Sequence, residues 1–267
     1  SPEELGVPES VIDLYQRKRG LVLVTGPTGS GKSTTLYATL GDVARPEINI
    51  ITVEDPVEFR MRGINQVQVN NKAGMTFAAA LRSILRADPD VVLIGEIRDQ
   101  ETANIAIEAS LTGHLVLSTL HTNDAPSAVT RLTEMGVEPF LLSSSLAAVM
   151  AQRLARRLCK KCKRQDTATE AELRTLGVPH MPDTPLPTIW RPVGCRECAN
   201  TGYSGRVAIQ QVMGVDSTME DLIARGATSI DIDKAAKEQG MTTLRKDGWQ
   251  KALQGITSVE EVLRVTV

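Results

Sequence analysis

Short runs of apolar residues alternate with segments of helical periodicity in the first half of the chain. The runs lie at 21–24, 48–53, 91–94 and 115–117. Residues 77–85 and 101–112 instead repeat apolar side chains at helical spacing, with Thr76 as the expected N-cap of the first segment. Strands that are apolar on both faces are typical of a parallel sheet covered by helices. The pattern predicts an α/β fold whose ligand sites lie at the carboxyl ends of the strands.

The second half of the chain has a mainly helical pattern. We predict helices at 126–135 and 140–157, a strand at 206–213, and small helices near 217–225, 230–239, 242–253 and 258–264. Thr167 and Glu170 have the spacing of a capping box, which predicts the start of a short helix. Five prolines within 179–192 predict irregular backbone outside the core.

A glycine-rich motif, GPTGSGKS, follows the first predicted strand and precedes a helical segment. Its glycines Gly26, Gly29 and Gly31 allow successive backbone N–H groups to point at phosphate oxygens. Lys32 can reach the β- and γ-phosphates, and the hydroxyl of Ser33 can bind Mg²⁺. The motif predicts binding of a nucleoside triphosphate but does not identify the reaction.

Acidic residues follow two of the other predicted strands. Glu54, Asp55 and Glu58 follow the second strand, and Glu96 follows the third. A carboxylate at that edge can polarise an attacking water or hold Mg²⁺ through water. Taken alone, each could be a surface charge. Beside a phosphate loop, we interpret Glu58 and Glu96 as functional.

Two of the three histidines, His114 and His121, stand on either side of the fourth predicted strand. Their spacing differs from the four-residue spacing by which a helix presents two zinc ligands, and no cysteine is near. We interpret them as groups that sense the γ-phosphate or couple polar segments. The alternative is that they are packed or solvated rings.

The four cysteines form two Cys-x-x-Cys pairs, Cys159/Cys162 and Cys195/Cys198. Four thiolates complete a tetrahedral Zn²⁺ site with no open position. A secreted disulfide scaffold would be smaller and richer in cysteine, so the pairs predict structural zinc in a reducing, cytoplasmic setting. The alternatives are disulfides or free thiols, and an iron–sulfur cluster. The 32 residues between the pairs predict an insertion that is too poor in apolar residues to fold without metal.

A basic cluster surrounds the first cysteine pair. It consists of Arg153, Arg156, Arg157, Lys160, Lys161, Lys163 and Arg164. One interpretation is a solvated helix end stabilised by the helix dipole. The other is a docking face for acidic protein or lipid headgroups. Nucleic acid is disfavoured, because no aromatic residues alternate with these charges and the net charge of the chain is −2.

The length of 267 residues allows one large domain with an appendage. We divide the sequence into a nucleotide-binding core at 1–155, a tetracysteine metal-binding segment at 156–205, and a C-terminal strand and helices at 206–267. No run approaches the ~18 apolar residues of a membrane span. Because the chain starts with Ser-Pro rather than Met, we expect it to be part of a longer protein.

The ordered motifs GPTGSGKST, ITVEDPVEF, LRSILRADPDVVLIGEIRD and TGHLVLSTLHTND, with the cysteine pairs, resemble the secretion ATPases of type II secretion and type IV pilus assembly. The resemblance implies that 26–34 is the Walker A motif, 54–58 the Asp box, 90–96 the Walker B motif and 114–121 the His box. It implies catalytic roles for Glu96 and Glu58, together with Lys32. The nucleotide-binding residues that we expect are Gly26, Pro27, Thr28, Gly29, Ser30, Gly31, Lys32, Ser33, Thr34, Glu54, Asp55, His114 and His121.

The same resemblance implies a RecA-like P-loop ATPase core that binds ATP and Mg²⁺. It also implies a homo-hexamer in the full-length protein and docking on an inner-membrane platform protein, so that the chain is cytoplasmic and reaches the membrane only through partners. Arginines that reach the γ-phosphate in this family lie partly in a preceding domain, and such groups contribute roughly 10³–10⁵ in rate. We therefore expect this chain to bind ATP and to hydrolyse it slowly.

Two other classes of function fit part of the pattern. A P-loop small-molecule kinase would need an acceptor pocket and a lid, and the sequence contains no arginine-rich lid motif. A zinc-containing nucleic-acid-binding module is disfavoured by the balanced charge. Within the motor class, protein secretion and pilus extension both remain open, whereas the cysteine pairs disfavour retraction motors and type IV secretion ATPases.

Overall fold

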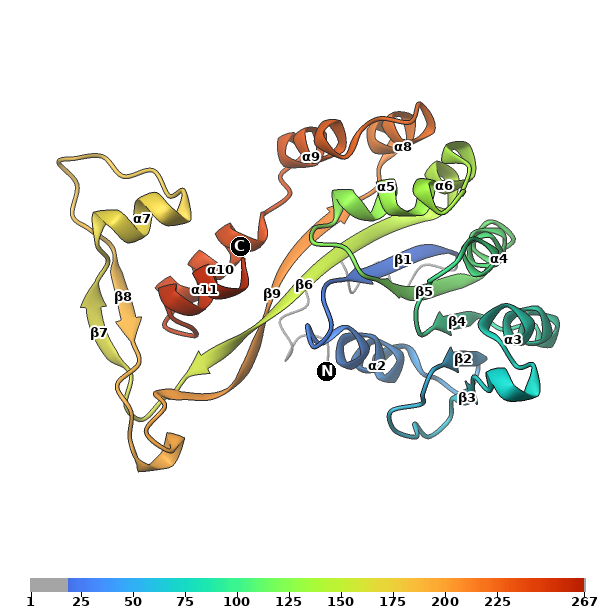
Figure 1. Cartoon of the computed structure of the whole chain (residues 1–267), viewed down its shortest axis with the longest axis horizontal. Helices are drawn as coiled ribbons and strands as arrows, with labels where there is room; N and C mark the ends of the chain where they lie inside the picture. The colour runs from blue at the N-terminus through green and yellow to red at the C-terminus, as the bar shows by residue number, and fades with distance from the viewer. Residues whose placement is uncertain (1–18, 267) are drawn as a thin grey trace. The chain divides into compact units, whose positions relative to one another are not determined.

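The computed structural model describes residues 19–266, so the beginning of the predicted segment 1–155 lies outside the described residues. The chain forms two compact units (Figure 1). The first unit extends to Ala151 and resumes at Val212–Met241, and the second contains Gln152–Gln211 and the residues from Thr242 onward. The three segments that we divided the sequence into stay a prediction.

A central sheet of seven strands has the order β3-β2-β4-β5-β1-β6-β9. The strands are β1 (Gly20–Thr25), β2 (Ile50–Glu54), β3 (Asn65–Gln68), β4 (Val91–Ile94), β5 (Leu115–Leu120), β6 (Leu146–Leu158) and β9 (Tyr203–Gly214). Every pairing from β3 across to β6 is parallel. This confirms the predicted parallel α/β sheet, although β3 had no signal in the apolar pattern.

Helices cover both faces of this sheet, which is why its inner strands β1, β2, β4 and β5 are buried along their whole length. Leu21 and Leu23 of β1 belong to one core, and Val22 and Val24 belong to the core on the opposite face. Helix α2 (Lys32–Val43) packs on the second core. The first core receives α3 (Phe77–Ile84), α4 (Gln100–Leu111), α5 (Pro126–Glu134), α6 (Pro139–Ser145), α8 (Ser217–Ala224) and α9 (Ser229–Glu238) (Figure 1). Within residues 19–266, no helix has both the length and the apolar character needed to cross a bilayer.

The helix predicted at 140–157 is wrong beyond Ser145. Helix α6 ends there, and Leu146 begins strand β6, which pairs with β1. Side chains such as Ser143 and Ser145 donate to carbonyls of their own helix and so compete with its backbone bonds. The following residues favour helix locally, but burial beside β1 outweighs this preference of a few tenths of a kcal/mol per residue.

The second unit has its own small core. It contains an antiparallel pair, β7 (Arg164–Thr167) and β8 (Thr188–Arg191), with helices α7 (Glu170–Leu176), α10 (Leu244–Leu253) and α11 (Val259–Val265). The insertion between the cysteine pairs contributes Ala168, Leu173, Leu176 and Ile189 to this core, and α10 and α11 supply Trp249 and other apolar residues. The proline-rich stretch therefore ends in a core strand, contrary to the prediction, because Ile189 is fully buried.

The predicted capping box lies two residues further along the chain. The hydroxyl of Thr169 accepts from the N–H of Glu172 at 3.2 Å, and the Glu172 carboxylate accepts from the N–H of Thr169 at 2.8 Å. Thr167 and Glu170 have the same sequence spacing, but Thr167 is paired with Thr188 in the β7–β8 ladder. The helix consequently starts after the strand has ended. The predicted N-cap Thr76 is confirmed, since its hydroxyl accepts from the N–H of Ala79.

Candidate functional site

Four of the segments predicted to bind nucleotide lie at one edge of the sheet, where strands end. The phosphate loop follows β1, His121 follows β5, Glu96 follows β4, and Glu54 ends β2. Strands β2, β4, β5 and β1 are consecutive parallel neighbours, so their carboxyl ends line up side by side. This edge is where α/β sheets bind ligands.

The phosphate loop joins β1 to α2. Gly29 and Gly31 have φ angles of 79° and 84°, a left-handed conformation that glycine adopts without a steric penalty. The Lys32 ammonium is mostly buried and donates to the carbonyl oxygens of Gly26 and Pro27 at 2.8 and 3.0 Å. Thr28, Ser33 and Thr34 are exposed beside it, whereas Ser30 is buried. The loop backbone thus curls around its own lysine, and its contacts with phosphate stay a prediction.

Two threonines connect the phosphate loop to the segment that carries His121. The Thr25 hydroxyl lies 2.7 Å from that of Thr122, accepts from the Thr122 N–H at 2.8 Å, and contacts the Leu120 carbonyl oxygen at 3.1 Å. Thr25 directly precedes Gly26, and Thr122 directly follows His121. Sequence reasoning missed this connection, because neither threonine belongs to a spaced motif.

Glu96 follows β4 at this edge of the sheet, and both of its carboxylate oxygens have partners. One of its oxygens pairs with Arg98, and the other lies 3.5 Å from Nε2 of His121. Burial opposes the charged form of Glu96, but the hydrogen bond and charge of Arg98, with a contribution from His121, outweigh it and lower the pKa. Glu96 is therefore ionised at neutral pH. Arg98 was not predicted as a site residue, although it lies two residues from Glu96.

Glu54 lies in a network of neutral donors beneath the loop that follows β2. It is buried, and it accepts hydrogen bonds from the hydroxyl of Tyr37, from the hydroxyl of Thr52 at 2.6 Å and from the amide of Gln66 at 3.2 Å. These donors occupy both carboxylate oxygens. The structure thus places Glu54 behind the exposed edge, although it was expected to contact nucleotide.

Two other predicted acidic residues, Asp55 and Glu58, lie in the exposed loop after β2. The Glu58 side chain is open to solvent, while its backbone N–H donates to the hydroxyl of Tyr37 at 3.2 Å. Asp55 is near enough to Arg98 to help raise the pKa of that guanidinium, after the larger effect of the Glu96 hydrogen bond. The loop therefore faces the same edge as Glu96.

His114 lies at the amino end of β5, whereas His121 lies at its carboxyl end, where the phosphate loop also lies. The two residues flank β5, whose six residues span about 20 Å at ~3.3 Å each. The Nδ1 atom of His114 lies 3.0 Å from the carbonyl oxygen of Ala109, at the end of α4. The structure does not bring His114 to the phosphate loop of its own chain. The separation of the two histidines could have been predicted from the sequence, because residues at the two ends of one strand are too far apart to share a site.

The four cysteines come together in the second unit, with all four Sγ atoms within 4.8 Å of one another. The Sγ–Sγ distances are 3.9 Å for Cys159–Cys195 and 3.8 Å for both Cys162–Cys198 and Cys195–Cys198. Four thiolates at ~2.3 Å from one tetrahedral zinc ion would be about 3.8 Å apart. The donor set and its spacing therefore fit Zn²⁺.

Backbone N–H groups point at two of these sulfur atoms. Cys195 and Gly202 donate to Sγ of Cys198 at 3.2 Å each, and Gly194 donates to Sγ of Cys162 at 3.3 Å. Burial disfavours the Cys198 thiolate, but the two N–H groups and the neighbouring thiols lower its pKa to about 6. Burial and the neighbouring thiols instead raise the pKa of Cys162 to about 11. Only the Cys198 sulfur is therefore favoured as a thiolate, the form that binds metal, in the absence of an ion.

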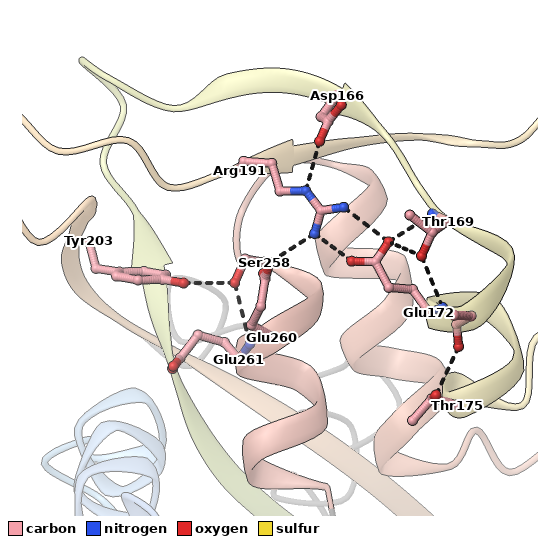
Figure 2. A network of polar contacts seen from close by, with 10 residues as sticks. Asp166, Thr169, Glu172, Thr175, Arg191, Tyr203, Ser258, Glu260 and Glu261 are labelled. Atoms are coloured by element: carbon pink, nitrogen blue, oxygen red, sulfur yellow. Dashed lines mark hydrogen bonds and ion pairs between the residues drawn. The ribbon is translucent and has the colours of Figure 1, made fainter.

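Ion pairs tie the elements of the second unit together (Figure 2). The Arg191 guanidinium on β8 contacts Asp166 at 2.9 Å, Glu172 at 2.5 Å and Glu260 at 2.8 Å. Hydrogen bonds from Arg191 lower the pKa of both Asp166 and Glu172. One arginine thus connects β7, α7 and α11, and no sequence motif indicated it.

The basic cluster is not a helix end, as one interpretation held, because its first three residues lie in β6. Arg156 pairs with Glu261 and stacks over the Tyr203 ring at 4.1 Å. Lys163 lies over the Trp190 ring at 4.6 Å. The helix dipole therefore does not account for these charges.

A phosphate loop between a strand and a helix, with carboxylates after neighbouring parallel strands, defines the chain as a P-loop α/β nucleotide-binding protein. Residues 7–264 match the family described as "Type II/IV secretion system protein", and the chain belongs to that family. It is 52% identical over 256 residues to type II secretion system protein E of Aeromonas hydrophila, covering 96% of this chain and 50% of that protein. It is 50% identical over 262 residues to the type IV pilus assembly ATPase PilB of Thermus thermophilus, covering 98% of this chain and 29% of PilB.

Among solved structures, the pilus retraction motor PilT with bound ADP is similar, with a TM-score of 0.75 and 29% identity. The match covers 99% of this chain and 66% of the PilT chain. The chain spans half or less of the length of the two curated relatives. The family and the RecA-like α/β fold expected from the sequence motifs are thus confirmed.

Proposed function

We propose that the chain is the ATP-hydrolysing motor module of a type II secretion or type IV pilus assembly machine. The observation that carries the proposal is the placement of Glu96, His121 and the phosphate loop on adjacent parallel strands. Lys32 and the loop N–H groups would bind the phosphates, and Ser33 would hold Mg²⁺. Ionised Glu96, together with Glu58, would orient and activate the attacking water. The family assignment favours this class over the kinase and nucleic-acid alternatives.

The test measures phosphate release from Mg-ATP and the affinity for a fluorescent ATP analogue. Glu96→Gln is expected to lower the hydrolysis rate by about 10² or more and to keep nucleotide affinity, because general-base contributions have that size. Lys32→Ala is expected to lose affinity. Glu101→Gln, which removes an exposed carboxylate paired with Arg82, is the matched control. Unchanged hydrolysis in Glu96→Gln, or γ-phosphate transfer to a small acceptor, would contradict the proposal.

We also propose that the four cysteines hold one structural zinc ion. Four thiolates leave no open position for substrate, so the metal would stabilise the turns that carry the cysteines and would not take part in hydrolysis. Metal analysis of freshly purified, unchelated protein is expected to find about one equivalent of zinc. Less than half an equivalent would count against the assignment.

The assembly and location follow from the same proposal. We propose a homo-hexamer in the full-length cytoplasmic protein, which reaches the inner membrane only through a platform protein. The exposed cations Lys160 and Lys161 are candidate docking residues. Lys160→Glu combined with Lys161→Glu is expected to weaken binding to the cytoplasmic part of the platform protein and to leave ATP affinity unchanged. Equal binding by the variant and the unmodified protein would exclude these two residues.

A further inference from the structure

The side chain of Tyr37 connects the phosphate-loop helix to the loop that carries Glu58. Tyr37 lies in α2, five residues after Lys32, and is buried. Its hydroxyl donates to the carboxylate of Glu54 and accepts from the backbone N–H of Glu58 at 3.2 Å. Its ring packs edge-to-face on Phe59, with the centroids 4.5 Å apart. One side chain thus makes three contacts within residues 54–59.

The direction of these hydrogen bonds is fixed by their partners. Glu54 is an acceptor, and the Thr52 hydroxyl and Gln66 amide already donate to its other oxygen. The Tyr37 proton must therefore point at Glu54, which leaves an oxygen lone pair for the Glu58 N–H. Burial, with the hydrogen bond to Glu54, raises the pKa of Tyr37 to about 12, so the hydroxyl stays protonated. Both bonds are made at any physiological pH.

We propose that Tyr37 is a positioning residue that aligns the backbone of Glu58 with the phosphate loop. Lys32 and Ser33 lie in the first turn of α2, and Tyr37 lies in the next turn of the same rigid helix. Any shift of that helix when phosphates bind is passed to Glu58 through the hydroxyl and to Phe59 through the ring. The proposal rests on the proposed function, in which Glu58 acts on the attacking water.

Tyr37→Phe tests this, because it keeps the ring and removes only the hydroxyl. We expect ATP affinity within about twofold of the unmodified chain and a kcat that falls by roughly three- to tenfold, the size of a lost hydrogen bond to the neutral backbone N–H of Glu58. Thr39→Val is the matched control: it removes a buried hydroxyl from the same helix, where that hydroxyl donates only to the Thr35 carbonyl oxygen at 2.9 Å. Its kcat is expected to stay unchanged.

Two further readouts separate positioning from simple stabilisation. In a Glu58→Gln background, Tyr37→Phe is expected to cause no further fall in kcat. Hydrogen exchange without nucleotide is expected to speed up at the Glu58 amide in Tyr37→Phe and not in Thr39→Val. Unchanged kcat and exchange in Tyr37→Phe, or effects that add fully to those of Glu58→Gln, would overturn the proposal. If Glu96→Gln releases phosphate at the same rate as the unmodified chain, the proposed function fails, and amide exchange alone decides whether Tyr37 holds Glu58.

Discussion

Replacement of Glu261 by glutamine tests how far one buried carboxylate stabilises the second unit. Glu261 lies in the first turn of α11 and is 1% exposed. Its oxygens accept from the backbone N–H and the guanidinium of Arg156 at 2.8 and 2.7 Å, and from the guanidinium of Arg264 at 2.9 and 2.7 Å. Glu261→Gln keeps the shape of the side chain and removes its charge.

The magnitude follows from the pKa of Glu261. Burial opposes ionisation, but Arg264 and Arg156 outweigh it and lower the pKa from 4.5 to about 2. At ~1.36 kcal/mol per unit, the charge contributes about 3 kcal/mol. The loss stays below the ~3–5 kcal/mol of a broken buried ion pair, because both arginines are half exposed and can be hydrated. Since the folded-state pKa is depressed, this stabilisation is complete above pH ~4.5 and disappears as the pH falls towards 2.

Tryptophan fluorescence can follow this unit alone, because Trp190 and Trp249 are the two tryptophans of the chain and both lie in it. Urea titrations at pH 7, 5, 4 and 3 are expected to give a difference of about 2–3 kcal/mol at pH 7 that shrinks below pH 4.5. Glu170→Gln, in the exposed first turn of α7, is the control for a lost helix-terminal charge. A difference under about 1 kcal/mol, or one that does not change with pH, would refute the electrostatic reasoning.

Three other changes test the rest of the structure. Cys195→Ser is expected to lose bound zinc and to lower the free energy of unfolding of the second unit by a few kcal/mol, measured by metal analysis and Trp fluorescence; full zinc retention would contradict the four-thiolate site. Gly248→Ala places a Cβ atom 2.7 Å from a methyl of Val262 and is expected to cost about 1–3 kcal/mol in a urea titration, with partial rescue by Val262→Ala; no loss would mean that the helices separate easily. His121→Ala is expected to slow ATP hydrolysis more than tenfold, whereas His114→Ala changes it less than twofold, as phosphate release would show; equal effects would contradict the separation of the two rings.

The parts of the site that follow directly from backbone pattern were predictable. A strand, a glycine-rich turn and Lys32 specify the phosphate loop because each requirement is local. Glu96 was predictable for the same reason, since it follows a buried strand whose carboxyl end must face the loop. The four cysteines were predictable as one site, because thiolate pairs at this spacing have few uses besides metal binding.

The contacts that join distant segments were not predictable from local pattern. Tyr37 meets Glu54 across 17 residues, and Thr25 meets Thr122 across 97 residues, and neither pair has a characteristic spacing. Residues 146–157 continue a pattern that predicts helix, and many of them are alanine, leucine or arginine, which favour helix in isolation. The neighbouring strand β1 decides otherwise, and its influence is not visible within the segment itself.

The core of the second unit limits what the proposed zinc ion would contribute to its stability. The insertion was expected to need zinc because its own apolar residues are few, yet Leu173 and Ile189 pack with Trp249 and Val262 from the C-terminal helices. Arg191 adds ion pairs from β8 to both α7 and α11. Burial and ion pairing therefore hold the hairpin and helices, while a proposed zinc ion on the four thiolates would fix only the two turns where the chain enters and leaves the insertion. Removal of zinc is accordingly expected to loosen these turns and to leave the emission maximum of the buried Trp249 almost unchanged.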